Sequence, residues 1–107
     1  MKTRSETAAY CLGLPGTYSD FPFDDNWQAI RHNGNKKCFA FIFDHNGGTW
    51  LNVKCDPEWK FMWLNSSESI VPAYHMNKKH WISIILDEKV PDETIRILIE
   101  NSYDLTD

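Results

Sequence analysis

One short stretch of this sequence, residues 74–81, gathers side chains that can bind anions or carry protons. It contains His75, Asn77, Lys78, Lys79 and His80. Extended segments flank it, so we interpret it as a hairpin tip that projects two ammonium groups and two imidazoles from one end of a sheet. Ammonium groups placed in this way are suited to contacting the phosphates of a nucleic acid.

A second basic group, Lys36 and Lys37 with the nearby Arg31, adjoins another predicted turn. The dipeptide Asn33-Gly34 between two extended runs indicates a hairpin, because both residue types tolerate positive φ. If both turns met one ligand, these bases and the two lysines of the tip could neutralise about four or five phosphates. The alternative is that both turns are simply solvated, and the sequence does not tell whether they lie at the same end of the sheet.

The histidines of the tip do not make a complete metal site. His75 and His80 flank a four-residue tip and could face one another across two strands, about 5 Å apart at Cβ. Structural zinc needs four ligands, and the cysteines Cys11, Cys38 and Cys55 are far apart with no Cys-x-x-Cys pair. We therefore predict no bound metal and no cofactor.

The sequence contains no recognisable catalytic motif. It has no nucleophile elbow and no glycine-rich phosphate loop, and its one run of acids after the Phe-Pro-Phe element, Asp24-Asp25, is more typical of a solvated turn than of a metal site. The three cysteines are expected to be reduced and to serve mainly as small buried hydrophobic residues. We predict a protein that is not an enzyme.

The charge balance limits how this chain could bind a polyanion. The 107 residues carry a formal net charge of −4, yet the middle of the chain, residues 26–82, is basic and holds all four histidines, whereas residues 83–107 are strongly acidic. An acidic protein can bind DNA only through a local basic face. No apolar run approaches the roughly 20 residues that span a bilayer, so we expect a cytoplasmic protein with no membrane contact.

The pattern of elements predicts one α+β domain over residues 1–107. Helices are predicted over residues 5–12, from the Asp56 cap to Asn65–Ser67, and from Pro91 onward; strands over 27–32, 37–43, 49–54 and 81–86; an extended segment over 70–74; and an irregular arm over 18–26. The order α-β-β-β-α-β-β-α predicts an antiparallel sheet with helices on one face, a two-layer sandwich.

Details of the pattern predict where each element lies. The run 38–43 is apolar on both of its sides, which predicts a central strand covered on both faces, and Pro72 predicts an edge position. The last helix should bury a stripe consisting of Ile95, Leu98, Ile99 and Tyr103.

The five tryptophans admit two interpretations. Ordinary burial in the core is one. Because helices on one side leave the other side of the sheet uncovered, an interaction patch or ligand surface of aromatic residues on an open sheet face is the other. In the second predicted helix, Trp59, Met62 and Trp63 share one face.

Several stretches, in order along nearly the whole chain, carry a family resemblance. They are Tyr10–Leu12 with Leu14–Gly16, Asp20–Phe23, Lys37–Ala40, Leu51–Pro57, Pro72–Trp81, Val90–Asp92 and Ser102-Tyr103. On these stretches the sequence resembles the MmcQ/YjbR family of small bacterial proteins, and residues 74–81 are the most specific of them.

The resemblance implies a CyaY-like (frataxin-like) fold and a DNA-binding role through two protruding wings, here the turns at Lys36-Lys37 and Lys78-Lys79. Asp24-Asp25 departs from the small residue expected after the Phe-Pro-Phe element. Iron acceptance in frataxin-like proteins goes with an acidic first helix, and this one offers only Glu6, so we do not predict iron binding.

From the basic turns and the resemblance together we predict binding of double-stranded DNA. The alternative is a protein-interaction or small-ligand module that uses an open aromatic sheet face.

Overall fold

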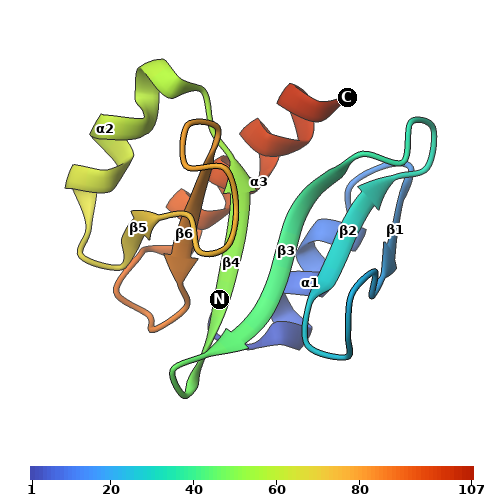
Figure 1. Ribbon diagram of the computed structural model, residues 1–107, viewed down its shortest axis with the longest axis horizontal. Coiled ribbons are helices and arrows are strands. Elements are labelled where there is room, and N and C mark those ends of the chain that lie inside the picture. The colour runs from blue at the N-terminus through green and yellow to red at the C-terminus, as the bar shows by residue number, and fades with distance from the viewer.

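The computed structural model describes residues 1–107 as one six-stranded antiparallel sheet with three helices (Figure 1). The elements are α1 (Arg4–Leu12), β1 (Thr17–Asp20), β2 (Gln28–His32), β3 (Cys38–His45), β4 (Gly48–Lys54), α2 (Pro57–Ser66), β5 (Ile70–Pro72), β6 (Trp81–Ile85) and α3 (Asp92–Thr106). The strand order across the sheet is β1-β2-β3-β4-β6-β5. The predicted α+β class with an antiparallel sheet is confirmed.

The structure contains one strand more than predicted. Residues 17–20 form the edge strand β1 and pair with β2 from Thr17↔His32 to Asp20↔Ala29, although the irregular arm was predicted to begin at residue 18. All four of its residues are half-buried. Its sequence, Thr-Tyr-Ser-Asp, also lacks the alternation of apolar and polar side chains that identifies a strand in a sequence. The irregular segment is therefore confined to the residues between β1 and β2.

Helices α1 and α3 cover one face of the sheet and lie behind it in Figure 1. Their apolar side chains and those of the strands form one core of 17 buried residues. In α3 the predicted residues Ile95, Leu98 and Ile99 are buried, whereas Tyr103 is half-buried. Burying each large aliphatic side chain stabilises the fold by about 1.5–3 kcal/mol.

Helix α2 does not lie over that face but beside the edge strand β5 (Figure 1). Its start is as predicted: Pro57 occupies the first turn, and the Asp56 side chain accepts a hydrogen bond from the Glu58 N–H at 2.9 Å. None of its residues is buried, and Trp59 and Met62 are 56% and 47% exposed. The shared face predicted for this helix therefore contributes little to the core.

Strand β3 is covered on both faces, as predicted, and its residues 39–43 are buried. The register with β2 shifts between Ile30↔Ala40 and Arg31↔Cys38, which leaves Phe39 as an extra residue in a bulge. As a result Phe39 and Ala40 both join the core under the helices. Pro72 lies in the edge strand β5, also as predicted.

Strands β3 and β4 move apart beyond the pair Ala40↔Val53 (Figure 1). There the Ser102 hydroxyl of α3 replaces the direct ladder: it accepts a hydrogen bond from the Lys54 N–H at 2.8 Å and donates one to the Phe39 carbonyl at 2.6 Å. This opening separates the turns that follow β2 and precede β6.

No helix has the length and apolar character needed to cross a membrane.

Candidate functional site

The two lysine turns lie at the same end of the sheet. The β2–β3 turn follows His32 and precedes Cys38, while β6 begins at Trp81, which pairs with Lys54 at the end of β4. Because neighbouring strands are antiparallel, the start of β3, the end of β4 and the start of β6 meet at one end. Figure 1 shows both turns there, with the C-terminal end of α3 between them in this view.

The β2–β3 turn is held by hydrogen bonds that leave its lysine side chains free. Lys36 adopts a φ of 62°, and its N–H donates to the His32 carbonyl at 2.8 Å. Asn35 accepts from the Lys37 N–H and donates to the Thr106 carbonyl of α3, each at 2.8 Å. The hairpin is confirmed, but the left-handed residue is Lys36 and not Gly34.

Arg31 braces this turn and is not free to bind a ligand. Its Nε lies 2.9 Å from Asp20 Oδ1 in an ion pair, and its Nη1 donates to the Lys36 carbonyl at 3.1 Å. The hydrogen bond to Asp20 raises the pKa of the guanidinium above its usual value. Its charge is therefore largely balanced by the neighbouring strand β1.

The connection between β5 and β6 begins on the sheet and does not project as a whole. Asn52 of β4 donates to the Tyr74 carbonyl at 2.9 Å, and the Tyr74 N–H donates to Ser83 of β6 at 2.9 Å. The Ser83 hydroxyl also donates to Asn52, and both side chains are fully buried. This polar clamp holds residues 73–76 against the sheet, so the predicted tip is shorter than expected.

The projecting part of the connection is the turn at residues 77–80. Asn77 accepts a hydrogen bond from the Lys79 N–H at 2.8 Å, and its carbonyl accepts from the Trp81 N–H at 3.1 Å. Lys60 of α2 donates to the Lys78 carbonyl at 3.0 Å. Asn77 thus shapes the turn, while the side chains of Lys78 and Lys79 are exposed and form no ion pair.

The two histidines of the predicted tip have different surroundings. The His75 ring lies 4.1 Å from the Tyr74 ring, on the sheet face. His80 is half-buried next to β6, and its carbonyl accepts a hydrogen bond from the Cys55 N–H at 2.7 Å. The β5–β6 ladder ends at Pro72↔Ile82, so these histidines do not pair across strands. The chain contains no group of three or more His, Cys, Asp or Glu side chains arranged to hold a metal ion.

The sheet face opposite α1 and α3 carries no helix, and aromatic side chains from neighbouring loops cover part of it. Trp27 stacks on Phe43 with ring centroids 3.9 Å apart, and Tyr74 lies 5.8 Å from the same ring. Phe41 and Phe43 are consequently buried. What stays accessible on this face is a pocket of about 350 Å³ lined by Phe23, Asp24, Trp27, Phe41, His75 and Met76.

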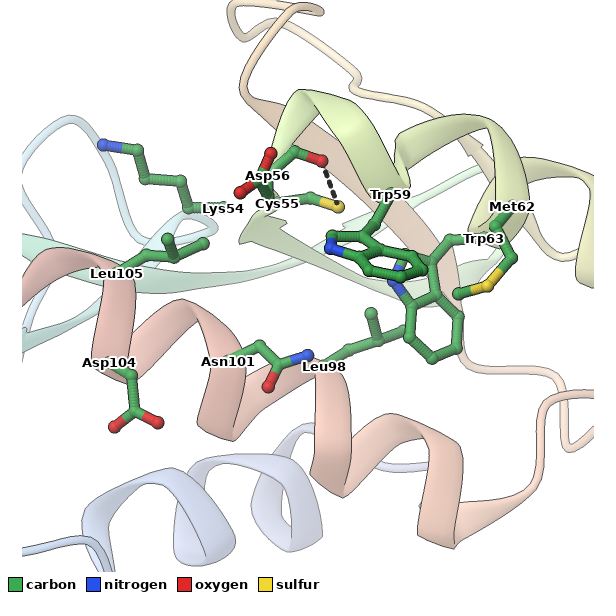
Figure 2. Close-up of a pocket in the computed structure, with 10 residues that line it drawn as sticks. All are labelled: Lys54, Cys55, Asp56, Trp59, Met62, Trp63, Leu98, Asn101, Asp104 and Leu105. Atoms are coloured by element: carbon green, nitrogen blue, oxygen red, sulfur yellow. Dashed lines mark hydrogen bonds between the residues drawn. The ribbon is translucent and has the colours of Figure 1, made fainter.

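A larger pocket of about 510 Å³ lies between α2 and α3 (Figure 2). Its lining consists of Trp59, Met62 and Trp63 from α2, Leu98, Asn101, Asp104 and Leu105 from α3, and Lys54, Cys55 and Asp56 from the segment after β4. The Cys55 thiol donates to the Asp56 carbonyl at 3.4 Å, and burial raises its pKa, so it is not poised as a nucleophile. The spacing of Trp59, Met62 and Trp63 on one helix face was the signal for this pocket, but the sequence does not show that this face lies next to α3.

Comparisons with known proteins agree on one family. A family model described as YjbR matches residues 12–105. The chain is 36% identical to protein YyaQ of Bacillus subtilis, covering 99% of each chain, and 28% identical to protein YjbR of Escherichia coli K12, covering 94% of this chain and 84% of that one.

Solved structures show the same fold. The crystal structure of Deinococcus radiodurans protein DR2400, with a domain of the model DUF419, has a TM-score of 0.86 at 32% identity, over 98% of this chain and 78% of the other. A crystal structure of a Pseudomonas syringae protein has a TM-score of 0.86 at 31% identity, over 98% and 99%. None of these names states an activity. This chain belongs to the YjbR family.

Proposed function

We propose that this protein binds double-stranded DNA through the lysines of its two turns, and that it works by binding and not by catalysis. One observation carries the proposal: Lys36, Lys37, Lys78 and Lys79 are exposed on two turns at the same end of the sheet, and none of them forms an ion pair. Unpaired ammonium groups are available to replace the counterions that surround DNA phosphates.

The charges between the turns favour two separate contacts over one continuous face. Lys54 and Lys60 add ammonium groups near the β5–β6 turn. Asp104 and Asp107 at the end of α3, however, would repel phosphates from the centre of this end. The duplex would therefore touch the two turns like two wings, with about four phosphates neutralised and a log–log salt slope of roughly −4.

Two double variants test the proposal. Lys36→Ala with Lys37→Ala, and Lys78→Ala with Lys79→Ala, should each weaken duplex binding for every sequence and flatten the salt slope by up to about 2 units, close to one per lost contact. Titrations at several salt concentrations, followed by fluorescence anisotropy of labelled DNA, measure both quantities.

The matched control is Lys2→Ala with Lys89→Ala. It removes the same charge from two exposed lysines that lie away from both turns, so it should change the slope little. Unchanged affinity and slope in both turn variants, with intact circular dichroism, would overturn the proposal; so would an equal loss in the control, because that result would point to net charge alone.

The proposal includes the finer properties that the family resemblance implies. The fold would be of the CyaY-like (frataxin-like) type, which agrees with a single antiparallel sheet covered by the first and last helices. The site of action would be the cytoplasm, where bacterial DNA is accessible. Superposition on a frataxin structure and imaging of a fluorescent fusion in cells test these two statements.

A second candidate function, binding of an apolar peptide segment by α2, rests on a different observation. Helix α2 has no buried residue and exposes Trp59 and Met62, which line the pocket of Figure 2. Contiguous exposed apolar side chains of this kind mark interaction sites.

Peptides selected against the protein from a random library should lose binding on Trp59→Ala but not on Phe61→Ala, which is equally apolar but does not line the pocket. Failure to select any peptide, or equal losses, would contradict it.

A further inference from the structure

We propose that the pocket on the aromatic sheet face binds a small organic cation with a quaternary ammonium group. The pocket is lined by Phe23, Asp24, Trp27, Phe41, His75 and Met76. Its volume of about 350 Å³ lies at the lower end of the range for ligand pockets, about 300–1,000 Å³. This inference does not depend on DNA binding, since it uses none of the lysine turns.

Three aromatic rings form the walls of this pocket. The Phe41 ring has its centroid 5.8 Å from that of Trp27 at an angle of 70°, and 6.0 Å from that of Phe23 at 25°. The Trp27 and Phe41 walls are therefore steeply inclined to each other. Trp27 is held in place by its stack on Phe43, so most of the cage exists before a ligand arrives. Rings around a cation attract it through their negative faces.

Asp24 gives the pocket a negative charge that no cation of the protein balances. Its Oδ1 accepts hydrogen bonds from the N–H groups of Asn26 and Trp27, both at 2.9 Å, which fixes the carboxylate and leaves its second oxygen available. The nearby Arg4 binds Asn26 and Asp44 instead. His75 is the other titratable group of the lining. A carboxylate beside aromatic walls selects a cation over a neutral ring or an anion.

The same lining favours a quaternary over a primary ammonium group. A primary ammonium carries three N–H donors, each of which needs an acceptor when it leaves water. The lining offers one carboxylate side chain, an imidazole, a thioether and three rings, which is too few acceptors. A quaternary group has no donor to satisfy, and its methyl groups fit apolar walls. The cation charge would be met by the rings and by Asp24 together.

Choline and its neutral analogue, in which carbon replaces the nitrogen, test the assignment. Isothermal titration of the protein should show saturable binding of choline and at least tenfold weaker binding of the analogue. Asp24→Asn, which keeps the acceptor for the two backbone N–H groups, should weaken choline binding about tenfold. Phe23→Ala should weaken it about two- to fivefold, as expected for one exposed cation–π contact.

Neighbouring residues supply matched controls for both variants. Asp25→Asn removes the same charge, and Phe21→Ala removes an exposed ring from the same segment, but neither residue lines the pocket; both variants should bind choline nearly as the unchanged protein does. Equal binding of choline and its analogue, no saturable binding of either, or equal losses in variants and controls would overturn the proposal. Tighter binding of a trimethyl-lysine peptide than of choline would overturn the assignment to a free small molecule.

Discussion

The two faces of the sheet are closed by different means. On one face, α1 and α3 press aliphatic side chains against the strands and leave one continuous core. On the other face, no helix is present, and rings from two irregular segments, around Trp27 and Tyr74, cover Phe41 and Phe43. The larger pocket lies between two helices, α2 and α3, whereas the pocket on the face without helices lies among aromatic side chains of the sheet and its loops. The pocket proposed to bind a small cation is the one on the loop-covered face.

The two faces also differ in where their buried polar side chains lie and in which groups these side chains bond. On the helix side, the buried Ser102 hydroxyl lies at the splayed ends of β3 and β4 and replaces ladder bonds there. The aromatic side instead buries Asn52 and Ser83 in the middle of the sheet and uses them to hold the main chain of Tyr74. A buried amide without partners is costly, so the loop and the polar pair depend on each other.

The largest effect is expected for the helix face. Leu98 is 1% exposed, and Leu98→Ala should lower the free energy of unfolding by about 2–5 kcal/mol through lost burial and the cavity left behind. Urea denaturation followed by circular dichroism measures the loss. Ile97→Ala, at an exposed position of the same helix, is the control and should stay within about 1 kcal/mol. A loss below about half a kcal/mol for Leu98→Ala would mean that α3 does not face the sheet as described.

The next largest effect is expected for the polar clamp on the aromatic face. Asn52→Ala should lower the free energy of unfolding by about 1–3 kcal/mol, because the Tyr74 carbonyl loses its donor and Ser83 loses a partner. Amide hydrogen exchange should increase over residues 74–76. Combined with Ser83→Ala, the two losses should be clearly less than additive, since both variants release the same segment. Full additivity would show that the two side chains act independently.

Cys11 and Cys38 pack in different clusters, one on each face of the sheet, and both have raised pKa values. Burial raises the pKa of Cys11, in α1, to about 12 and that of Cys38, which packs on the aromatic side, to about 11, from an ordinary value of 9.0. Because the folded state holds these protons more tightly, their contribution to stability is complete below about pH 9 and declines as the pH rises toward 11 and 12. Cys11→Ala should remove part of this alkaline decline in a series of urea titrations.

Alkylation rates offer a second test of the difference between Cys11 and Cys38. Cys38 is half-buried and Cys11 is fully buried, so iodoacetamide should label Cys38 first as the pH is raised, with mass spectrometry following each peptide. Labelling of Cys11 before Cys38 in the folded protein would contradict the described burial. The expectation that the cysteines serve as buried small residues is confirmed for Cys11 and Cys55.

The sequence predicted the regular elements well because local signals specify them. The Asp56-Pro57 start, the apolar run of β3 and the stripe of α3 all match the structure. Strand β1 was missed because Thr17–Asp20 carries no apolar alternation; its pairing depends on main-chain ladders and on the ion pair between Asp20 and Arg31. That ion pair is also why a basic residue predicted for phosphate contact already has a partner.

The candidate sites depended on contacts between distant segments, which local patterns do not contain. Asn52 and Ser83 look like outward-facing polar residues of half-buried strands, and only their bonds to Tyr74 show that they are buried beneath a loop. The exposure of Trp59 follows from the position of α2 beside the edge of the sheet, a placement that its own periodicity does not determine. The placement of both lysine turns at one end likewise required the strand order.

The smallest effect is expected where the connection between β5 and β6 leaves the sheet. Its first part is clamped at Tyr74, but the lysine side chains of its turn contact nothing that holds the fold together. Lys78→Ala with Lys79→Ala should therefore change the free energy of unfolding by no more than about 0.5 kcal/mol, because the turn is shaped by Asn77 and by the Lys78 carbonyl, which the variant retains. Asn77→Ala serves as the contrast and should cost more, since it removes the acceptor for the Lys79 N–H. If the lysine variant were the more costly of the two in urea denaturation, its ammonium groups would belong to the structure and would not be available to a ligand.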